Sequence, residues 1–261
     1  MNFSLLIVVP TFNSYPLLPR LLLSLKNQSW TKWQLLFIDG TSGPEHRRWL
    51  EECCHLEPRC RWMKQSSAEP GIFGAMNDGF AAAKVGDWLL FWGSDDWAAS
   101  STVLADVLSV LEQTTTELSL PHLLVCSGVY ANNSSGALGR LTKFNLFSSF
   151  RCSLLLGSTP PHQATFIGPG ARARLARYAD GFRLSADLDY FLQLSRFDDL
   201  CVQVLDLELV HMSSGGISGQ QTQRRLQEVR RAYQRSFGWL WWFPFIARYL
   251  RRLFSLLDAR R

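Results

Sequence analysis

The chain has 261 residues, of which 47% are hydrophobic and 13% aromatic, so it can bury a substantial core and suits one large domain. Its formal net charge of +5 is uneven, because residues 221–261 hold ten arginines against two acids, a charge of +8 that leaves −3 for the rest. A basic end on a mildly acidic body suits an anionic membrane surface better than a nucleic acid, since no helix-turn-helix, zinc-finger or RNA-binding motif accompanies the charge.

The first hundred residues alternate between apolar runs and leucine-rich stretches with helical spacing. Strands are predicted at 4–9, 33–40, 59–64 and 87–96, with helices at 15–30, 44–54 and 71–85 between them. This rhythm predicts an α/β fold with a mostly parallel central sheet and helices on both faces.

The second half has a less regular pattern. A helix is predicted at 100–116, strands near 122–130, 138–147 and 201–210, and a helix at 185–194 with Ser185 as its N-cap. No linker precedes residue 219. We therefore predict a domain over 1–220, with halves at 1–98 and 99–220, and a helical tail over 221–261.

The cysteines and the N-terminus bear on location. The six cysteines, at positions 53, 54, 60, 126, 152 and 201, show no CxxC pair, which predicts free thiols in a reducing cytosol. The N-terminal apolar run is short and has no basic region, so it reads as a strand and not as a signal peptide. The expected location is cytoplasmic, with peripheral contact to the inner face of the membrane.

Polar residues stand where three of the predicted strands end. Thr11 and Asn13 follow the first strand, Asp39 ends the second, and Asp95 and Asp96 follow the fourth. Ligands of open α/β sheets bind at the carboxyl ends of strands. Adjacent carboxylates repel phosphate unless a divalent cation bridges them, and Mg²⁺ uses one or two carboxylates together with substrate phosphates. GxGxxG and P-loop motifs are absent, so the pattern favours a metal–phosphate site over a dinucleotide or P-loop site.

Ordered motifs over residues 3–220 resemble those of family 2 glycosyltransferases of the GT-A fold, in particular the exopolysaccharide (colanic-acid-type) branch. The motifs are "VVPTFN", "LLFIDGTSG", "AEPGIFGAMNDGF", "GDWLLFWGSDD", "HQATFIG", "GFRLSADLDYFLQL" and "GGIS". The resemblance implies an inverting enzyme that moves a sugar from a nucleoside-diphosphate sugar to a saccharide or lipid-linked acceptor in cell-surface polysaccharide synthesis. The alternatives are a non-catalytic sugar-nucleotide-binding or membrane-scaffold protein and a nucleotidyltransferase.

The resemblance also implies roles for particular residues. The donor would be bound by Pro10, Thr11, Asn13, Asp39, Asn77 and Asp95, and Mg²⁺ or Mn²⁺ by Asp96 with Asp95. Asp187 would be the catalytic base, with Asp189 as the alternative on the same helix. His162 and Gln163 would lie on the acceptor side, and His211 would be a further metal ligand; a structural role is the alternative for both histidines.

Three positions depart from the family pattern. Gly40 replaces a frequent aspartate, Gly74 stands where an acidic residue is common, and Ala186 replaces the glutamate that usually precedes the base. The segment before Gly74 is also two residues short. The core acids remain, so we expect activity with altered donor affinity or sugar choice.

The tail is apolar and aromatic and then basic. Its uninterrupted apolar part, 237–247, is 11 residues long and contains Pro244, whereas a spanning helix needs about 20 residues. Tryptophans beside arginines over 237–256 fit an interfacial membrane contact. The alternative is a helix packed on the domain with solvated arginines.

Overall fold

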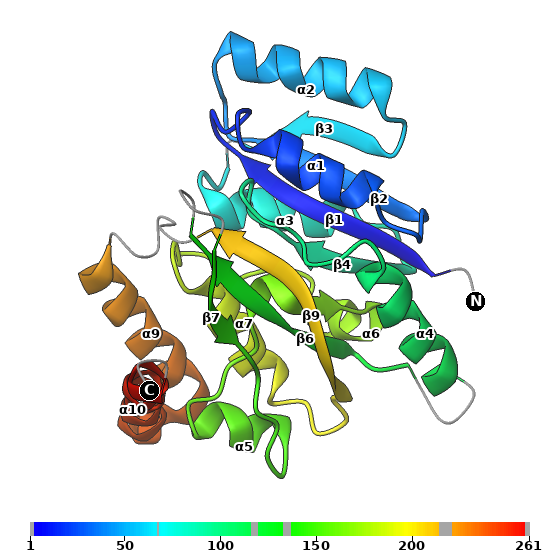
Figure 1. Cartoon of the computed structure of the whole chain (residues 1–261). Coiled ribbons are helices and arrows are strands. Elements are labelled where there is room, and N and C mark those ends of the chain that lie inside the picture. The colour runs from blue at the N-terminus through cyan, green and yellow to red at the C-terminus, as the bar shows by residue number, and fades with distance from the viewer. Residues whose placement is uncertain (1–2, 67, 116–119, 133–136, 214–220, 259–261) are drawn as a thin grey trace.

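The fold is that of a computed structural model, which describes residues 3–66, 68–115, 120–132, 137–213 and 221–258. Over these residues a nine-stranded sheet crosses the molecule, with the order β3-β2-β1-β4-β8-β6-β9-β5 and with β7 paired to β6 (Figure 1). The N-terminal strands are β1 (Ser4–Thr11), β2 (Trp33–Asp39), β3 (Cys60–Lys64) and β4 (Asp87–Phe91), and they pair with one another in parallel.

The second part of the sheet is mixed. Its strands are β5 (Trp97–Ala98), β6 (Leu123–Ala131), β7 (Leu138–Thr142), β8 (Thr165–Ile167) and β9 (Val202–Ser213). β8 runs antiparallel between β4 and β6, β7 is antiparallel to β6, and β6 and β9 are parallel. The prediction of a mostly parallel sheet was therefore wrong for this half. A three-residue strand such as β8 is too short to show a periodic signal.

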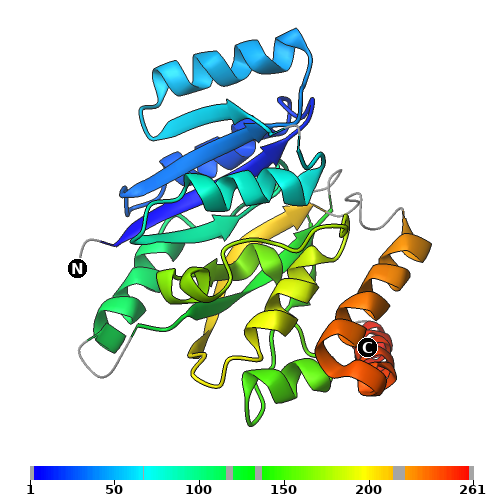
Figure 2. The same ribbon diagram turned by 180° about the vertical axis from the view of Figure 1, so that it is seen from behind.

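Helices cover both faces of the sheet, as predicted. One hydrophobic cluster contains α1 (Leu18–Lys26), α2 (Pro44–Leu56) and α4 (Val103–Thr115), and the other contains α3 (Ile72–Ala82), α5 (Phe150–Leu155), α6 (Pro169–Arg174) and α7 (Ala186–Leu194). Figures 1 and 2 show the two sets on opposite sides of the strands. Strand β1 is buried from Leu5 to Val9 because it lies between these two layers, which explains its uninterrupted apolar run.

The C-terminal segment forms α9 (Thr222–Phe237), a short 3-10 helix η2 (Gly238–Trp241) and α10 (Trp242–Asp258). Helix α9 lies against α7 (Figure 2), and its Val229, Ala232 and Tyr233 are buried in the same cluster as α7. The start of the predicted tail thus shares the core of the domain. In the part of the chain that the structure describes, no helix combines the length and apolarity needed to cross a bilayer.

Candidate functional site

The carboxyl ends of β1, β2 and β4 meet at one edge of the sheet. Thr11 pairs with Asp39 at the last register position of β1 and β2. The loops beyond β1 and β4 are tied together, because Ser14 Oγ donates to Ser94 Oγ at 2.8 Å and Ser94 Oγ donates to the carbonyl of Pro10 at 3.1 Å. The structure therefore brings the polar strand ends of the sequence together, as their order predicted.

Asp39 is completely buried and holds the loop that follows β2. Both of its carboxylate oxygens accept the backbone N–H of Ser42, at 3.1 and 3.2 Å. Asn13 braces the same loop: its N–H donates to Ser42 Oγ and its Oδ1 accepts from Gly43, both at 2.8 Å. The predicted contact of Asp39 with a nucleotide base remains a prediction, since the carboxylate here faces the loop.

His46 on α2 lies behind Asp39 and was not singled out from the sequence. Its Nε2 is 3.8 Å from Asp39 Oδ1, and neither ring nitrogen has a hydrogen-bond partner among the described residues. Burial lowers the pKa of His46, against the opposing effect of Asp39, so the ring is neutral at pH 7. A neutral ring here leaves the charge of Asp39 uncompensated by His46.

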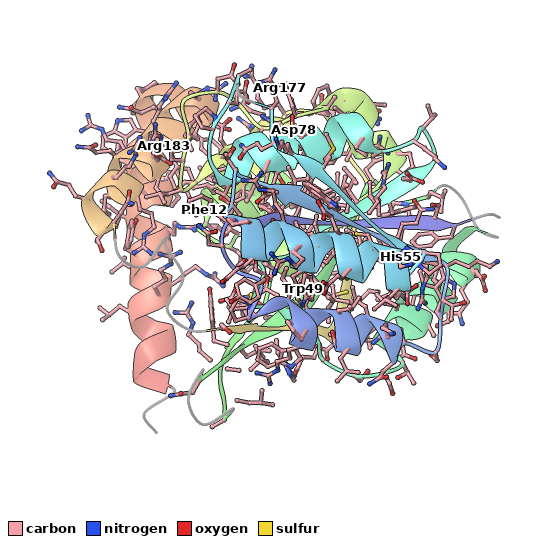
Figure 3. The ribbon with its side chains drawn as sticks, turned by 90° about the horizontal axis from the view of Figure 1, so that it is seen from above. Phe12, Trp49, His55, Asp78, Arg177 and Arg183 are labelled. Carbon is pink, nitrogen blue, oxygen red and sulfur yellow. The ribbon has the colours of Figure 1, made fainter. Side chains whose placement is uncertain are left out.

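Phe12 is a second residue that the sequence reasoning missed. Its side chain is 66% exposed. Figure 3 shows it near the N-terminal end of α2, whereas His55 marks the C-terminal end of that helix. An exposed aromatic ring among the polar strand ends offers a face on which a base can stack. Its signal was present in the sequence as the aromatic residue between Thr11 and Asn13.

The acids after β4 converge on Gly93. Asp96 is buried, and its Oδ2 accepts the N–H of Gly93 at 2.6 Å. A Cβ at Gly93 would lie 2.9 Å from Asp95 Oδ1 and 3.2 Å from Asp96 Oδ2, so a side chain there would crowd both carboxylates. Burial, followed by the charge of Asp95, raises the pKa of Asp96 to about 7, and burial raises the pKa of Asp95.

These two carboxylates fit a divalent cation that is shared with a substrate. Over the described residues no group of three or more His, Cys, Asp or Glu side chains could hold a metal ion by itself. Mg²⁺ and Mn²⁺ in phosphate sites use one or two carboxylates and complete their shell with phosphate oxygens and water. Burial raises the pKa of both carboxylates because it disfavours their charged forms. A bound divalent cation would stabilise those charged forms.

His211 is engaged elsewhere. It lies opposite Trp97 in the β5–β9 pairing, its Nε2 is 2.6 Å from Glu208 Oε1, and its ring meets that of Trp97 edge-on at 5.5 Å. These contacts give it a structural role, and its predicted part as a metal ligand has no support from them. The neighbouring end of β9 does reach the acids, since Ser213 Oγ donates to the carbonyl of Asp95 at 3.1 Å.

His162 and Asp187 lie beside β4 on the α7 side. The ring of His162 stacks on Phe91 at 5.6 Å, and its Nε2 is 2.6 Å from the hydroxyl of Tyr178. Burial lowers the pKa of His162, and the charge of Asp187 opposes this shift. Asp187 is half-buried, and its charge acts on His162, which stacks on the last residue of β4. Gln163 is placed through its backbone, because its carbonyl accepts from Trp92 Nε1 at 3.0 Å.

The structure separates the two acids of α7. Asp189 is buried, and its Oδ2 accepts from Arg235 Nη1 of α9 at 2.7 Å. This ion pair gives Asp189 a structural contact between α7 and α9. Asp187, by contrast, is half-buried, and its charge acts on His162. The placement favours Asp187 as the base, which stays a prediction.

Asn77 uses its side-chain amide inside the fold. Its Nδ2 donates to Glu69 Oε2 at 2.9 Å and to the carbonyl of Tyr178 at 3.2 Å, and its Oδ1 accepts from the N–H of Tyr178 at 2.8 Å. Asn77 thus joins α3 to the segment that carries the partner of His162. Its predicted contact with the nucleotide sugar remains a prediction.

The turn before Gly74 leaves no space for a side chain at this position. A Cβ at Gly74 would lie 1.7 Å from the carbonyl oxygen of Glu69, which leaves no room for any side chain. The turn is closed by Gln65, whose Nε2 donates to the carbonyls of Glu69 and Gly71, both at 2.7 Å. A side chain at Gly74, acidic or otherwise, would therefore require this turn to change. Ala186, the third departure, is completely buried, which a glutamate could not be without a partner.

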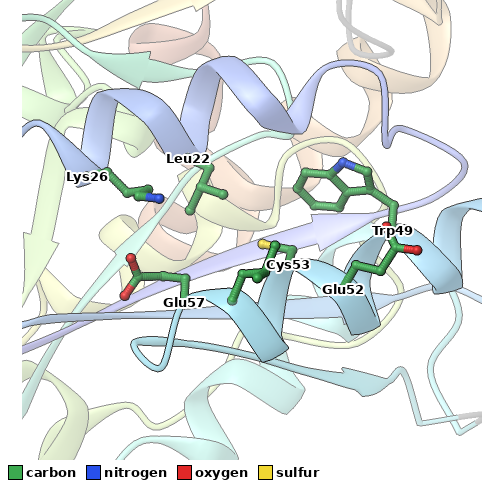
Figure 4. A pocket seen from close by; sticks show the side chains of 7 residues that line it. Leu22, Lys26, Trp49, Glu52, Cys53 and Glu57 are labelled. Carbon is green, nitrogen blue, oxygen red and sulfur yellow. The ribbon is translucent and has the colours of Figure 1, made fainter.

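A separate cavity of about 230 Å³ lies between α1 and α2 (Figure 4). It is lined by Leu22, Lys26, Trp49, Glu52, Cys53, Leu56 and Glu57. All six cysteines are free, as predicted. This cavity is lined by helix residues and includes none of the predicted site residues. The predicted motif at 215–218 lies outside the described residues.

Comparison with known proteins gives a matching family model and several named relatives. The model of the family "Glycosyl transferase family 2" matches residues 6–174, more than half of the chain. "PGL/p-HBAD biosynthesis glycosyltransferase" proteins of Mycobacterium bovis and Mycobacterium tuberculosis are 28% identical over 187 residues, which are 70% of this chain. The chain spans 66% of the length of these relatives.

Two solved structures show the same fold. S. aureus TarS 1-349 in complex with UDP-GlcNAc has a TM-score of 0.65 at 14% identity, over 90% of this chain and 68% of that one. The mannosyltransferase PcManGT from Pyrobaculum calidifontis, in complex with GDP-Man and Mn2+, has a TM-score of 0.64 at 13% identity, over 99% of this chain and 74% of that one. The mixed sheet of this chain, covered by helices on both faces, and its likeness to these structures support the predicted GT-A fold. The family match shows that this chain belongs to glycosyl transferase family 2.

Proposed function

We propose that the protein transfers a sugar from a nucleoside-diphosphate sugar to an acceptor hydroxyl, with inversion at the anomeric carbon. The observation that carries this proposal is the pair of carboxylates over Gly93, at the same edge of the sheet as the exposed Phe12 and just beyond the strand β4, whose last residue Phe91 contacts His162. Family membership adds the expectation of sugar transfer.

The donor side comprises the loops after β1, β2 and β4. Phe12 offers a stacking face for the base, and the loop braced by Asn13, Asp39 and Ser42 gives this wall a fixed shape. Asp95 and Asp96 would hold Mg²⁺ or Mn²⁺, which supplies positive charge where the diphosphate leaves. The Mn²⁺ in the PcManGT structure, whose fold is alike, is consistent with this assignment.

The acceptor side is centred on Asp187. Its carboxylate would take the proton of the attacking hydroxyl while the bond between the anomeric carbon and the diphosphate oxygen breaks. His162, held by Tyr178 and Phe91, forms a neutral wall next to this base. One base and one separate pair of acids suffice for a direct displacement, which inverts the anomeric centre.

We propose a saccharide or lipid-linked acceptor, in the synthesis of a cell-surface glycan of the exopolysaccharide type. The named mycobacterial relatives are glycosyltransferases of PGL/p-HBAD biosynthesis, which supports a role in a biosynthetic sugar transfer. The donor sugar is the first property to determine by experiment.

A donor screen tests this function. We expect one nucleotide sugar to raise the melting temperature in the presence of Mn²⁺ and much less without it, because binding to the native state at 100 times Kd adds about 2.7 kcal/mol. Transfer to added acceptors or hydrolysis of that donor should follow. Binding without any turnover would instead support the non-catalytic alternative, and no binding of any nucleotide sugar would contradict the proposal.

We further propose that α10 rests on a membrane surface. Its apolar side chains are exposed along one side, together with η2: Trp239, Leu240, Trp242, Phe243, Ile246, Leu250 and Leu253. The arginines of α10 are half-buried and turned to the protein, since Arg248 donates to Thr159 and Arg251 lies over Phe147. Arg230 of the adjacent helix α9 is exposed and lies over the ring of Trp241, so its charge would meet anionic headgroups beside this apolar side.

Substitution of the exposed face is the proper test, because Trp241 and Phe245 pack on the core and a truncation would uncover it. The variant Trp239→Ser, Trp242→Ser, Ile246→Ser should bind anionic liposomes at least about tenfold more weakly than wild type, since each apolar side chain that enters the interface contributes in proportion to its area. The matched control replaces apolar residues exposed elsewhere, Leu56→Ser and Val85→Ser. Equal co-sedimentation of all three proteins would contradict the membrane proposal.

A further inference from the structure

Glu228 on α9 reaches across to the start of α7. It is buried, and its carboxylate accepts three successive backbone N–H groups: Arg183 at 3.0 and 3.1 Å, Leu184 at 2.7 Å and Ser185 at 3.0 Å. A run of successive N–H groups forms a concavity that binds anions. Here the anion is a side chain 43 residues farther along the chain than Ser185.

This contact replaces the cap that the sequence predicts. Ser185 does occupy the N-cap position of α7, but its side chain makes no capping hydrogen bond. The carboxylate of Glu228 also lies near the positive end of the α7 dipole, where a negative charge is stabilising. Glu228 therefore fixes the chain that enters α7, and with it the first turn.

Two more contacts join the same helices. Arg231 Nη1 donates to the carbonyl of Gly181 at 3.2 Å, and Arg235 binds Asp189. Three residues of α9 therefore contact the segment 181–189. Arg231 binds it before α7, Glu228 binds it where α7 begins, and Arg235 binds it within the first turns of α7. Figure 2 shows α9 lying beside α7 over this stretch. Asp187 sits between the entry held by Glu228 and the residue held by Arg235.

We propose that Glu228 is a positioning residue for Asp187, an inference that rests on the proposed function. Asp187 is two residues beyond the last N–H that Glu228 binds, so a shift or fraying of the α7 entry moves its carboxylate relative to His162 and the end of β4. Glu228 does not touch the reacting atoms in this scheme. Its effect is on the reactive geometry of the base, and the donor loops on the other side of the site are independent of it.

The test compares Glu228→Gln with Asp87→Asn. Glutamine keeps the size of the side chain but removes its negative charge, and in either orientation its N–H₂ group faces at least the N–H of Arg183, so the concavity loses its anion. Asp87 is the matched control, because it is also buried and accepts a backbone N–H, from Lys84 at 2.8 Å, at the opposite end of β4. Both variants should lose stability, which thermal unfolding will compare.

Only Glu228→Gln should change catalysis. We expect its kcat to fall about 10- to 100-fold, the range that a displacement near 1 Å produces, with the donor Kd within about twofold of wild type. Amide hydrogen exchange in 183–189 should become faster in this variant and stay unchanged in Asp87→Asn.

The outcomes separate this inference from the function on which it rests. Equal kcat in both variants, with active wild type, would overturn the positioning role, as would unchanged exchange in 183–189. A lowered kcat with a donor Kd weakened to the same degree would show a general loss of structure and also contradict it. A wild-type protein that neither binds nor turns over any donor would contradict the proposed function. Amide hydrogen exchange in 183–189 would then still decide whether Glu228 holds the start of α7.

Discussion

Replacing Asp187 with asparagine will lower kcat for sugar transfer by about 10³-fold, the middle to upper range for loss of a general base, with donor binding within about twofold of wild type. Asparagine has the size of aspartate but takes no proton from the acceptor hydroxyl. The start of α7 is held by hydrogen bonds from its backbone N–H groups to the carboxylate of Glu228, and the substitution leaves these bonds in place. The measurements are steady-state kinetics with the donor identified by the screen and a donor titration of each protein.

Asp189→Asn is the control two residues away. Asp189 is bound to Arg235, so this change removes an ion pair between α7 and α9 and should lower the melting temperature. Its kcat should stay far above that of Asp187→Asn. The reverse ranking, with Asp189→Asn nearly inactive and Asp187→Asn close to wild type, would transfer the role of base to Asp189.

The first half of the fold was predictable, whereas the six-residue helices α5 and α6 were missed. The parallel half, β1 to β4 with its helices, shows apolar runs and helical spacings that local sequence determines. β8 and β5 were missed because strands of three and two residues have no period, and they exist only because neighbouring strands pair with them. The sheet is mixed because β8 lies antiparallel between β4 and β6 and because β5 and β7 are antiparallel to β9 and β6.

The candidate site was predictable where the chemistry is local to a strand end. Asp39, Asp95 and Asp96 were found because they follow apolar runs, and they do lie at one edge. The supports of the site were not predictable, since they are contacts between segments far apart in sequence. Glu228 lies 43 residues from the backbone that it binds, and Asn77 lies 101 residues from Tyr178. In the sequence Glu228 looks like an ordinary polar residue of a helix, and Asn77 was named for donor binding and not for its contact with Tyr178.

Replacing Asp96 with asparagine should weaken donor binding and strengthen the fold at once. In the presence of Mn²⁺ we expect donor affinity or kcat/KM to fall by about 10²-fold or more, because one of two anionic oxygen donors to the cation is lost. Without metal the same change removes a buried charge. Burial, followed by the charge of Asp95, raises the pKa of Asp96 to about 7, whereas the group has a pKa of 3.8 when unperturbed.

The sign of the stability effect follows from these two values. A group with a raised pKa in the folded state binds its proton more tightly there, so the wild type loses stability as the pH rises from about 4 to about 7, and the asparagine variant does not. Each pKa unit corresponds to about 1.4 kcal/mol, so the variant should be more stable by an amount on the order of a few kcal/mol at pH 8 and equal near pH 4. The Gly93 N–H keeps an acceptor in both proteins.

Chemical unfolding of metal-free protein at pH 4, 6 and 8 measures the effect, with Asp198→Asn, an exposed aspartate, as the control that should show no such trend. Gains in stability and losses in donor binding at the same residue would identify Asp96 as a group kept for function at a cost to the fold. A variant that is less stable than wild type at pH 8 would show that Asp96 is a structural acid of the turn after β4. Unchanged Mn²⁺-dependent donor binding would remove it from the metal site.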